Sequence, residues 1–122
     1  MDNKKKETLN KLDIQIVFIG AIVVAASMNI YITLGYKDLI LKEKNSKFTI
    51  KKLYRISLLS STIFLIVTIY FFIDALENYE RTKESYAFDF YMATVLSFIA
   101  QSIRVSTLKK YPDKIFGVED VI

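Results

Sequence analysis

The sequence predicts an all-α integral membrane protein, a three-helix bundle whose helices extend past the bilayer. The chain has 122 residues, of which 52% are hydrophobic and 25% are charged. The apolar residues gather in three long blocks, residues 14–36, 56–74 and 86–104, and most charges lie in the links and at the ends. A soluble helix would instead carry its apolar residues as a stripe along one face. We therefore expect a single membrane domain covering residues 1–122.

Residues 14–36 form the first expected span, and these 23 residues carry no formal charge. At 1.5 Å per residue such a helix is about 34 Å long, which is enough to cross a hydrocarbon core of about 30 Å. A cleaved signal peptide is the alternative, because lysines precede the block and Ala25, Ala26 and Ser27 are small. The apolar run continues well past the length of an ordinary signal peptide, so a membrane span is the stronger prediction.

Residues 56–74 form the second expected span, and the link before it is strongly basic. Lysines alternate with apolar residues in this link, which suits helix ends that lie along lipid headgroups with their lysine stems extended. Asn45 and Ser46 are the expected turn, because both favour turns and helix caps.

Residues 86–104 form the third expected span. The link before it contains no glycine or proline, which predicts two long helices that meet in a tight hairpin near residues 81–85. Pro112 disfavours helix at Tyr111, so the third helix should end near that position. The expected cytoplasmic tail then covers residues 105–122.

The basic residues favour an N-terminus outside the cell and a C-terminus in the cytoplasm. Lysine and arginine number seven in residues 37–55 and four from Arg104 onward, but four before residue 14 and two in the second link. The positive-inside rule places the more basic pair of segments in the cytoplasm. The N-terminal lysines argue for the opposite orientation. The abundance of Lys, Ile and Asn suggests a low-GC bacterial genome, so the expected location is a bacterial inner membrane.

Each expected span carries a stripe of small or polar residues that we predict to face another helix or a partner protein. Small residues let helix backbones approach closely, and a buried amide or hydroxyl can hydrogen-bond to a neighbouring helix. The predicted positions are Ala21, Ala25, Asn29 and Thr33 on the first helix, Ser57, Ser61 and Thr68 on the second, and Ala93, Ser97 and Gln101 on the third.

Charged residues at the span ends suggest two further contacts. Asp38 and Arg104 are both expected at the cytoplasmic ends of their helices, where they could form an ion pair; an arginine that extends to the headgroups is the alternative. Asp13, Asp74 and Asp89 fall at the outer ends and could collect a cation, although solvated carboxylates explain the same positions.

The composition excludes most enzymatic chemistry. Histidine and cysteine are absent, so the usual general base, the commonest metal ligand and a thiol nucleophile are all missing. We expect no enzyme, no cofactor and no bound metal. Membrane orientation accounts for the net charge of +4, so nucleic acid is not an expected partner.

These features predict an accessory or structural protein in the lipid bilayer that packs against a larger membrane partner or against itself. A homo-oligomeric pore former is the alternative, because three spans and a charged C-terminus resemble the layout of the first class of phage holins. A small channel or transporter subunit is a third possibility, although the sequence places no charge at the middle of a span. A pore would be lined by Asn29, Ser61, Thr68, Ser97 and Gln101.

Overall fold

The computed structural model describes residues 2–42 and 46–112, which form three α-helices and no strand. The helices are α1 (Asn3–Lys42), α2 (Ile50–Thr82) and α3 (Ser85–Lys110). The all-helical prediction is confirmed, and each apolar block lies inside one helix that extends past it. Part of the predicted turn, Asn45, and residues 113–122 of the predicted tail lie outside the described residues.

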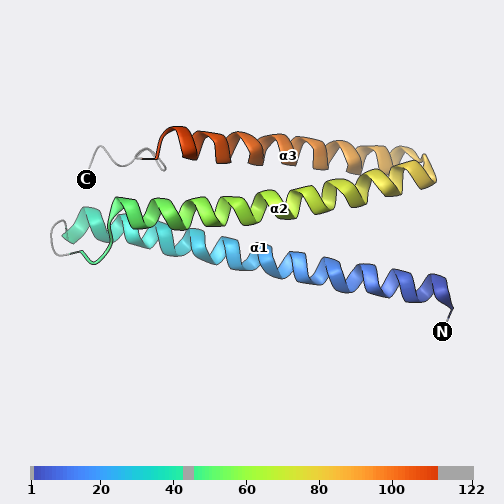
Figure 1. Ribbon diagram of the computed structural model, residues 1–122, viewed down its shortest axis with the longest axis horizontal. Coiled ribbons are helices and arrows are strands. Elements are labelled where there is room, and N and C mark those ends of the chain that lie inside the picture. The colour runs from blue at the N-terminus through green and yellow to red at the C-terminus, as the bar shows by residue number, and fades with distance from the viewer. Residues whose placement is uncertain (1, 43–45, 113–122) are drawn as a thin grey trace.

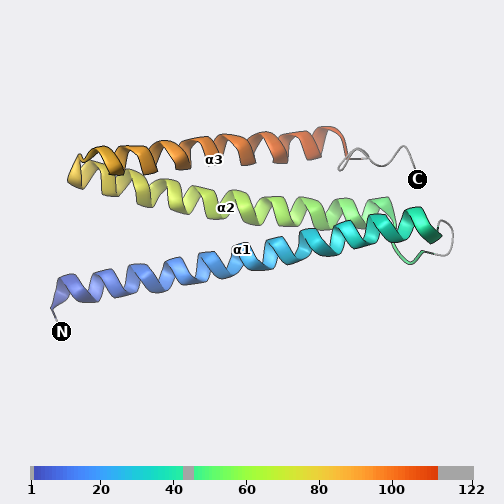
Figure 2. The same cartoon turned by 180° about the vertical axis from the view of Figure 1, so that it is seen from behind.

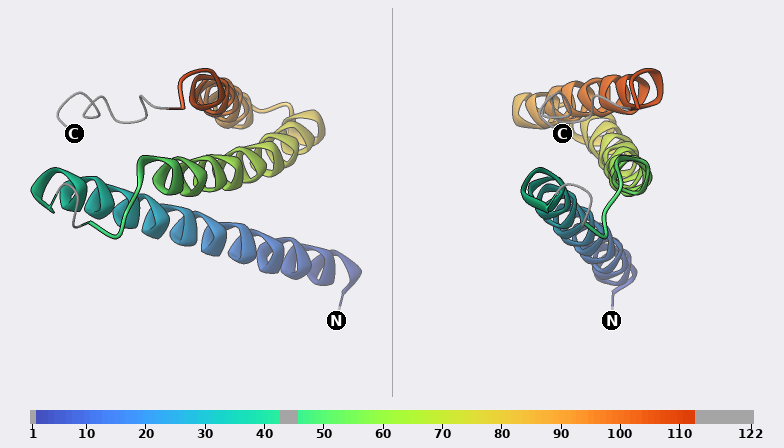
Figure 3. Two further views of the ribbon diagram at one scale, coloured as in Figure 1. Left: turned by 60° about the vertical axis from the view of Figure 1, so that its left-hand side comes forward. Right: turned by 90° about the vertical axis from the view of Figure 1, so that its left-hand side faces the viewer.

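The helix α2 lies between α1 and α3 (Figures 1 and 2). Successive helices run antiparallel, and α2 packs along both neighbours, whereas contacts between α1 and α3 are sparse in the described part of the chain. The end-on view shows α1 and α3 against different sides of α2 (Figure 3). Consequently α1 and α3 each leave a long outer face uncovered.

By length and composition, two of the described helices, α1 and α2, could cross a membrane. Only 11% of the most apolar stretch of α1 and 22% of that of α2 is buried inside the chain. Large apolar side chains such as Val17 and Leu41 are about 70% exposed. The packing of the chain on itself therefore leaves most of its apolar surface open.

The tightest packing occurs where α1 meets the start of α2. Ile32, Tyr36, Leu39, Phe48 and Leu53 form a buried apolar cluster at this end of the molecule, which we call the loop-end cluster. Gly35 allows the close approach, since a Cβ atom there would lie 2.6 Å from Leu53 Cδ2 and 3.0 Å from Phe48 Cδ1. The start of α2 is fixed by the side chain of Thr49, whose Oγ1 accepts a hydrogen bond from the backbone N–H of Lys52 at 3.1 Å.

The turn between α2 and α3 is tight, as predicted. Lys83 ends α2 in the left-handed conformation with φ of 57°, and its N–H donates to the carbonyl of Tyr79 at 2.8 Å. This conformation closes the helix but strains any residue that carries a Cβ atom. The next helix begins only two residues later, at Ser85.

Lys83→Gly is expected to stabilise the folded chain by about 0.5–1 kcal/mol, because glycine adopts the left-handed conformation without steric cost. The midpoint of SDS-induced unfolding in mixed micelles, followed by circular dichroism, measures this change. Lys83→Ala is the control, since it removes the side chain and keeps the strain. Equal midpoints for the two variants would contradict the prediction.

Candidate functional site

Hydrogen bonds between polar side chains join the three helices about one third of the way along α2 from its start. The donors and acceptors are Asn29 on α1, Ser60 and Ser61 on α2, and Arg104 on α3, which we call the polar cluster. Ser60 and Ser61 have no exposed surface. An interior polar group is costly unless it is hydrogen-bonded, so these contacts define how the helices pack.

Ser60 makes the contact between α1 and α2. Its hydroxyl lies 3.0 Å from the carbonyl oxygen of Ala25 and 3.0 Å from Asn29 Oδ1, and it shares its single proton between them. The structure therefore brings the predicted Ala25 and Asn29 to the helix interface. Sequence reasoning missed Ser60, although its position three residues after Ser57 places it on the same helix face.

Arg104 makes the contact between α2 and α3, because its Nε donates to Ser61 Oγ at 3.0 Å. Ser61 lies inside the uncharged residues 56–73 of α2, and the adjacent Ser60 lies level with Ala25 and Asn29. A formal positive charge therefore stands near the level of Asn29, about 10 Å inside the end of the apolar block of α1 at Tyr36. Arg104 is expected from the sequence at the level of Asp38, whereas its contact with Ser61 lies deeper than the end of that block.

The predicted ion pair between Asp38 and Arg104 does not form in the structure. Asp38 accepts a hydrogen bond from Ser46 at 2.6 Å and pairs with Lys42 at 3.2 Å. The cause is the register of the helices. Asp38 lies nine residues beyond Asn29, which is about 13 Å along the helix axis, whereas Arg104 stays near the level of Asn29.

Three predicted interface positions, Thr33, Ala93 and Ser97, are exposed. The hydroxyl of Thr33 donates to the carbonyl of Asn29, and that of Ser97 to the carbonyl of Ala93, so both bond to their own helix. A ladder of every fourth residue rotates about 40° per step, which turns Thr33 out of the interface. Among the other predicted positions, Ser57 is buried and Ala21, Thr68 and Gln101 are half-buried.

Aromatic rings supply contacts that the sequence analysis did not identify. Phe18 on α1 stacks on Tyr70 of α2 with centroids 4.1 Å apart and planes 7° apart. On the other side of α2, Phe72 lies 5.5 Å from Tyr91 of α3. Ring contacts on both sides of α2 therefore help to hold the three helices together.

At the far end of the α1–α2 pair, a salt bridge joins Lys11 Nζ to Asp74 Oδ1 at 2.7 Å. Gln15 Nε2 donates to the other oxygen of Asp74 at 3.4 Å. The described residues contain no group of three or more histidine, cysteine, aspartate or glutamate side chains that could hold a metal ion. Asp74 therefore acts as a helix-pairing residue in this structure.

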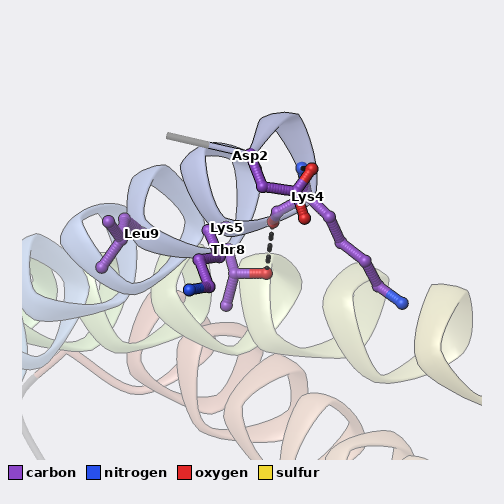
Figure 4. Close-up of a pocket in the computed structure, with 5 residues that line it drawn as sticks. All are labelled: Asp2, Lys4, Lys5, Thr8 and Leu9. Atoms are coloured by element: carbon purple, nitrogen blue, oxygen red, sulfur yellow. Dashed lines mark hydrogen bonds between the residues drawn. The ribbon is translucent and has the colours of Figure 1, made fainter.

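A shallow pocket lies at the N-terminal end of α1 (Figure 4). Asp2, Lys4, Lys5, Thr8 and Leu9 surround it, and all of them are exposed. The hydroxyl of Thr8 bonds to the carbonyl of Lys4 at 2.9 Å, which leaves it occupied within its own helix. Because a single helix forms this depression and no buried polar group faces it, the polar cluster is the better candidate site.

The link between α1 and α2 lowers the pKa of Asp38. The hydrogen bond from the Ser46 hydroxyl is the largest cause, burial opposes it, and Lys42 adds a further lowering through its hydrogen bond and charge. Because the pKa of folded Asp38 lies below its ordinary value of 3.8, the contact stabilises the folded chain at every pH above that value. The contribution is lost as the pH falls through the folded pKa.

Ser46→Ala is expected to raise the pKa of Asp38 toward 3.8, because it removes the donor with the largest effect. An NMR titration of the Asp38 carboxyl carbon in detergent micelles measures the pKa. Thr49→Ala is the control, since the Thr49 hydroxyl bonds to Lys52 and not to Asp38. An unchanged pKa in the Ser46 variant would show that the hydroxyl does not act on Asp38.

No protein-family model matches the chain, and comparisons with curated proteins and with solved structures find no match.

Proposed function

We propose that this chain is a small multi-pass membrane protein that serves as an accessory or structural subunit by packing against a larger membrane protein. The observation that carries the proposal is the exposure of α1 and α2. The core helix of a soluble protein is mostly buried, yet the most apolar stretches of α1 and α2 are 11% and 22% buried. Such a surface is stable in lipid or against a partner, and aggregates in water.

The contacts of α1 argue against a removable signal peptide. The helix α1 is joined to α2 at three separate levels. The contacts are a salt bridge from Lys11, a ring stack from Phe18 and a hydrogen bond from Ser60 of α2. Cleavage after the small residues near Ala25 would remove the first two of these contacts. We therefore propose that α1 stays in the membrane as the first span.

We further propose that α3 crosses beside α2, with the N-terminus outside and the C-terminus in the cytoplasm of a bacterial inner membrane. Packing of α3 along α2 supports the third span, because a helix that follows a spanning neighbour lies at the same depth. The basic link of residues 37–55 supports the orientation.

The placement of the polar side chains favours the accessory role over a pore. Ser61 is enclosed between helices and bonded to Arg104. Thr68 and Ser97 donate to backbone carbonyls of their own helices. A water-filled path needs polar groups that are available to water or ions, whereas these three hydroxyls are each hydrogen-bonded within the chain.

Single-cysteine labelling tests the membrane proposal, because the chain has no natural cysteine. Variants Lys5→Cys, Lys47→Cys, Lys83→Cys and Lys110→Cys, expressed in bacteria, are treated with a membrane-impermeant maleimide before and after cell lysis. Labelling of positions 5 and 83 in intact cells, with 47 and 110 labelled only after lysis, is expected. A chain recovered in the soluble fraction after lysis would overturn the proposal.

Membrane potential separates the accessory role from the pore former. Induced expression is expected to leave the potential and growth unchanged, as measured with a potential-sensitive dye and by colony counts. A rapid collapse of the potential on induction would support the holin-like alternative.

A further inference from the structure

Arg104 lies within the part of the chain that the proposed membrane would cover. It contacts Ser61, which is six residues beyond Arg55, the last charge before the apolar block of α2. At 1.5 Å per residue, the contact is about 9 Å inside the level of Arg55. A guanidinium at such a depth is costly and usually has a charged partner.

The chain itself supplies no counter-ion for Arg104 among the described residues. The two ion pairs found there join Lys11 to Asp74 and Lys42 to Asp38. A guanidinium carries five N–H donors, and the single hydrogen bond recorded for Arg104 in the described structure uses Nε. The residue is exposed, so its remaining donors are accessible from outside the chain.

Two buried polar atoms, each one helical turn along the sequence from a member of the contact between Arg104 and Ser61, have no hydrogen-bond partner in the described structure. Ser57 Oγ and Gln101 Oε1 are buried and accept no hydrogen bond there. Ser57 lies one helical turn before Ser61, and Gln101 lies one turn before Arg104. The chain therefore leaves unmet hydrogen-bonding capacity on both helices that flank the guanidinium.

The geometry distinguishes a protein partner from a lipid phosphate. The bond to the fully buried Ser61 holds the guanidinium against α2, whereas an arginine that serves the headgroups extends along its own helix toward them. Lys109 and Lys110 lie more than one turn beyond Arg104, in the last turn of α3. They are better placed than Arg104 to contact headgroup phosphates.

A second copy of the chain is a poor counter-ion donor. Copies that insert in the same orientation place equal residues at equal depth, so the charged residue that a second copy brings to the depth of Arg104 is its own Arg104. Residues 14–36 and 56–73 contain no acidic residue, and Asp89 of the third block lies 15 residues before Arg104, about 22 Å away along the helix. Among the described residues, neither the chain nor a second copy therefore supplies a carboxylate at this depth.

We infer that Arg104, held by Ser61, is the docking point for an aspartate or glutamate inside a transmembrane helix of a different membrane protein. This inference rests on the proposed membrane location. A carboxylate can accept two parallel hydrogen bonds from the free edge of a guanidinium. The pair would neutralise Arg104 and fix the depth at which the partner helix binds.

A synthetic transmembrane helix of leucine and alanine tests the inference. The helix carries one aspartate about 9 Å from its cytoplasmic end, and its twin carries asparagine at the same position. Energy transfer between the helix and the labelled full-length chain is measured in phosphatidylcholine vesicles. Wild type is expected to bind the aspartate helix about tenfold more tightly than the asparagine helix.

Variants of the chain assign the preference to Arg104. Arg104→Gln, which keeps a donor for Ser61, is expected to lose the preference, and Arg104→Lys to retain part of it. Arg81→Gln is the matched control, because Arg81 is exposed at the α2 end and bonds only to Asn78 in the described structure. Equal binding of the two helices to wild type would overturn the inference.

Flotation of the vesicles separates this inference from the membrane proposal. A chain that does not float with lipid fails the membrane proposal, whereas a chain that floats but shows no preference overturns the docking inference alone. If anionic phosphatidylglycerol in the vesicles abolishes the preference for the aspartate helix, Arg104 binds lipid phosphate, and this result would also overturn the docking inference. If the wild-type chain self-associates and Arg104→Gln removes this self-association, the contact of Arg104 is with a second copy. That result would likewise overturn the docking inference.

Discussion

Gly35→Leu is expected to destabilise the folded chain by about 1–3 kcal/mol, toward the upper end of that range. Even the Cβ atom of a new side chain would lie 2.6 Å from Leu53 Cδ2 and 3.0 Å from Phe48 Cδ1. Leu53 has no exposed surface, so it cannot turn away into solvent or lipid. The helices must therefore separate at the loop-end cluster, which outweighs the gain of about 1 kcal/mol from replacing glycine within a helix.

Gly20→Leu is the matched control for this prediction. Gly20 lies on the same helix and is exposed, and a Cβ atom added there would have no neighbouring atom within 4 Å. Its substitution is expected to leave stability unchanged or slightly increased. SDS titration of both variants in mixed micelles, followed by circular dichroism, compares them. Equal midpoints would show that α1 and α2 do not approach closely at Gly35.

The existence of the helices could be predicted from the sequence, but their contact faces could not. Long apolar blocks predict helices, because length and hydropathy suffice for that. In a chain that is apolar all round, small residues occur on several faces, and hydropathy does not rank them. Ala25 and Asn29 lie at the interface, whereas Thr33, one step further along the same ladder, does not.

The register of α3 could have been predicted, but from the turn and not from the apolar blocks. Arg104 lies 20 residues after Glu84 and Ser61 lies 22 residues before Lys83, so a tight antiparallel turn brings them level. Aligning the ends of the apolar blocks instead places Arg104 beside Asp38. The two-residue turn sets the register of α3 against α2, because so short a connection does not allow one helix to slide along the other by several residues.

The aromatic contacts were beyond sequence reasoning. Tyr70 stacks on Phe18 and Tyr91 lies against Phe72, but rings of these types also occur at lipid headgroups and facing lipid. To assign each ring to a helix contact, to lipid headgroups or to lipid chains, the rotation of each helix about its axis must be known. That rotation depends on the contacts themselves, so a single sequence does not define it.

Leu53→Ala is expected to destabilise the chain by about 2–5 kcal/mol, because Leu53 is fully buried in the loop-end cluster and its loss leaves a cavity. Leu59→Ala is the matched control on the same helix. Leu59 is 55% exposed, so its truncation removes little packing and should cost well under about 1 kcal/mol. The same unfolding titration compares the two variants, and equal costs would mean that the cluster does not hold α1 to α2.

Combining Leu53→Ala with Gly35→Leu tests whether these two residues are in direct contact. Both Cδ atoms of Leu53 lie within 3.2 Å of the position that a Cβ at Gly35 would take. Leu53→Ala removes both atoms, so the space it opens can accept the new leucine. The double variant should therefore be more stable than the sum of the single changes predicts, with a coupling of about 0.5–3 kcal/mol. Strict additivity would show that the Gly35→Leu defect does not arise from contact with Leu53, because two substitutions that share no contact have no means of compensating one another.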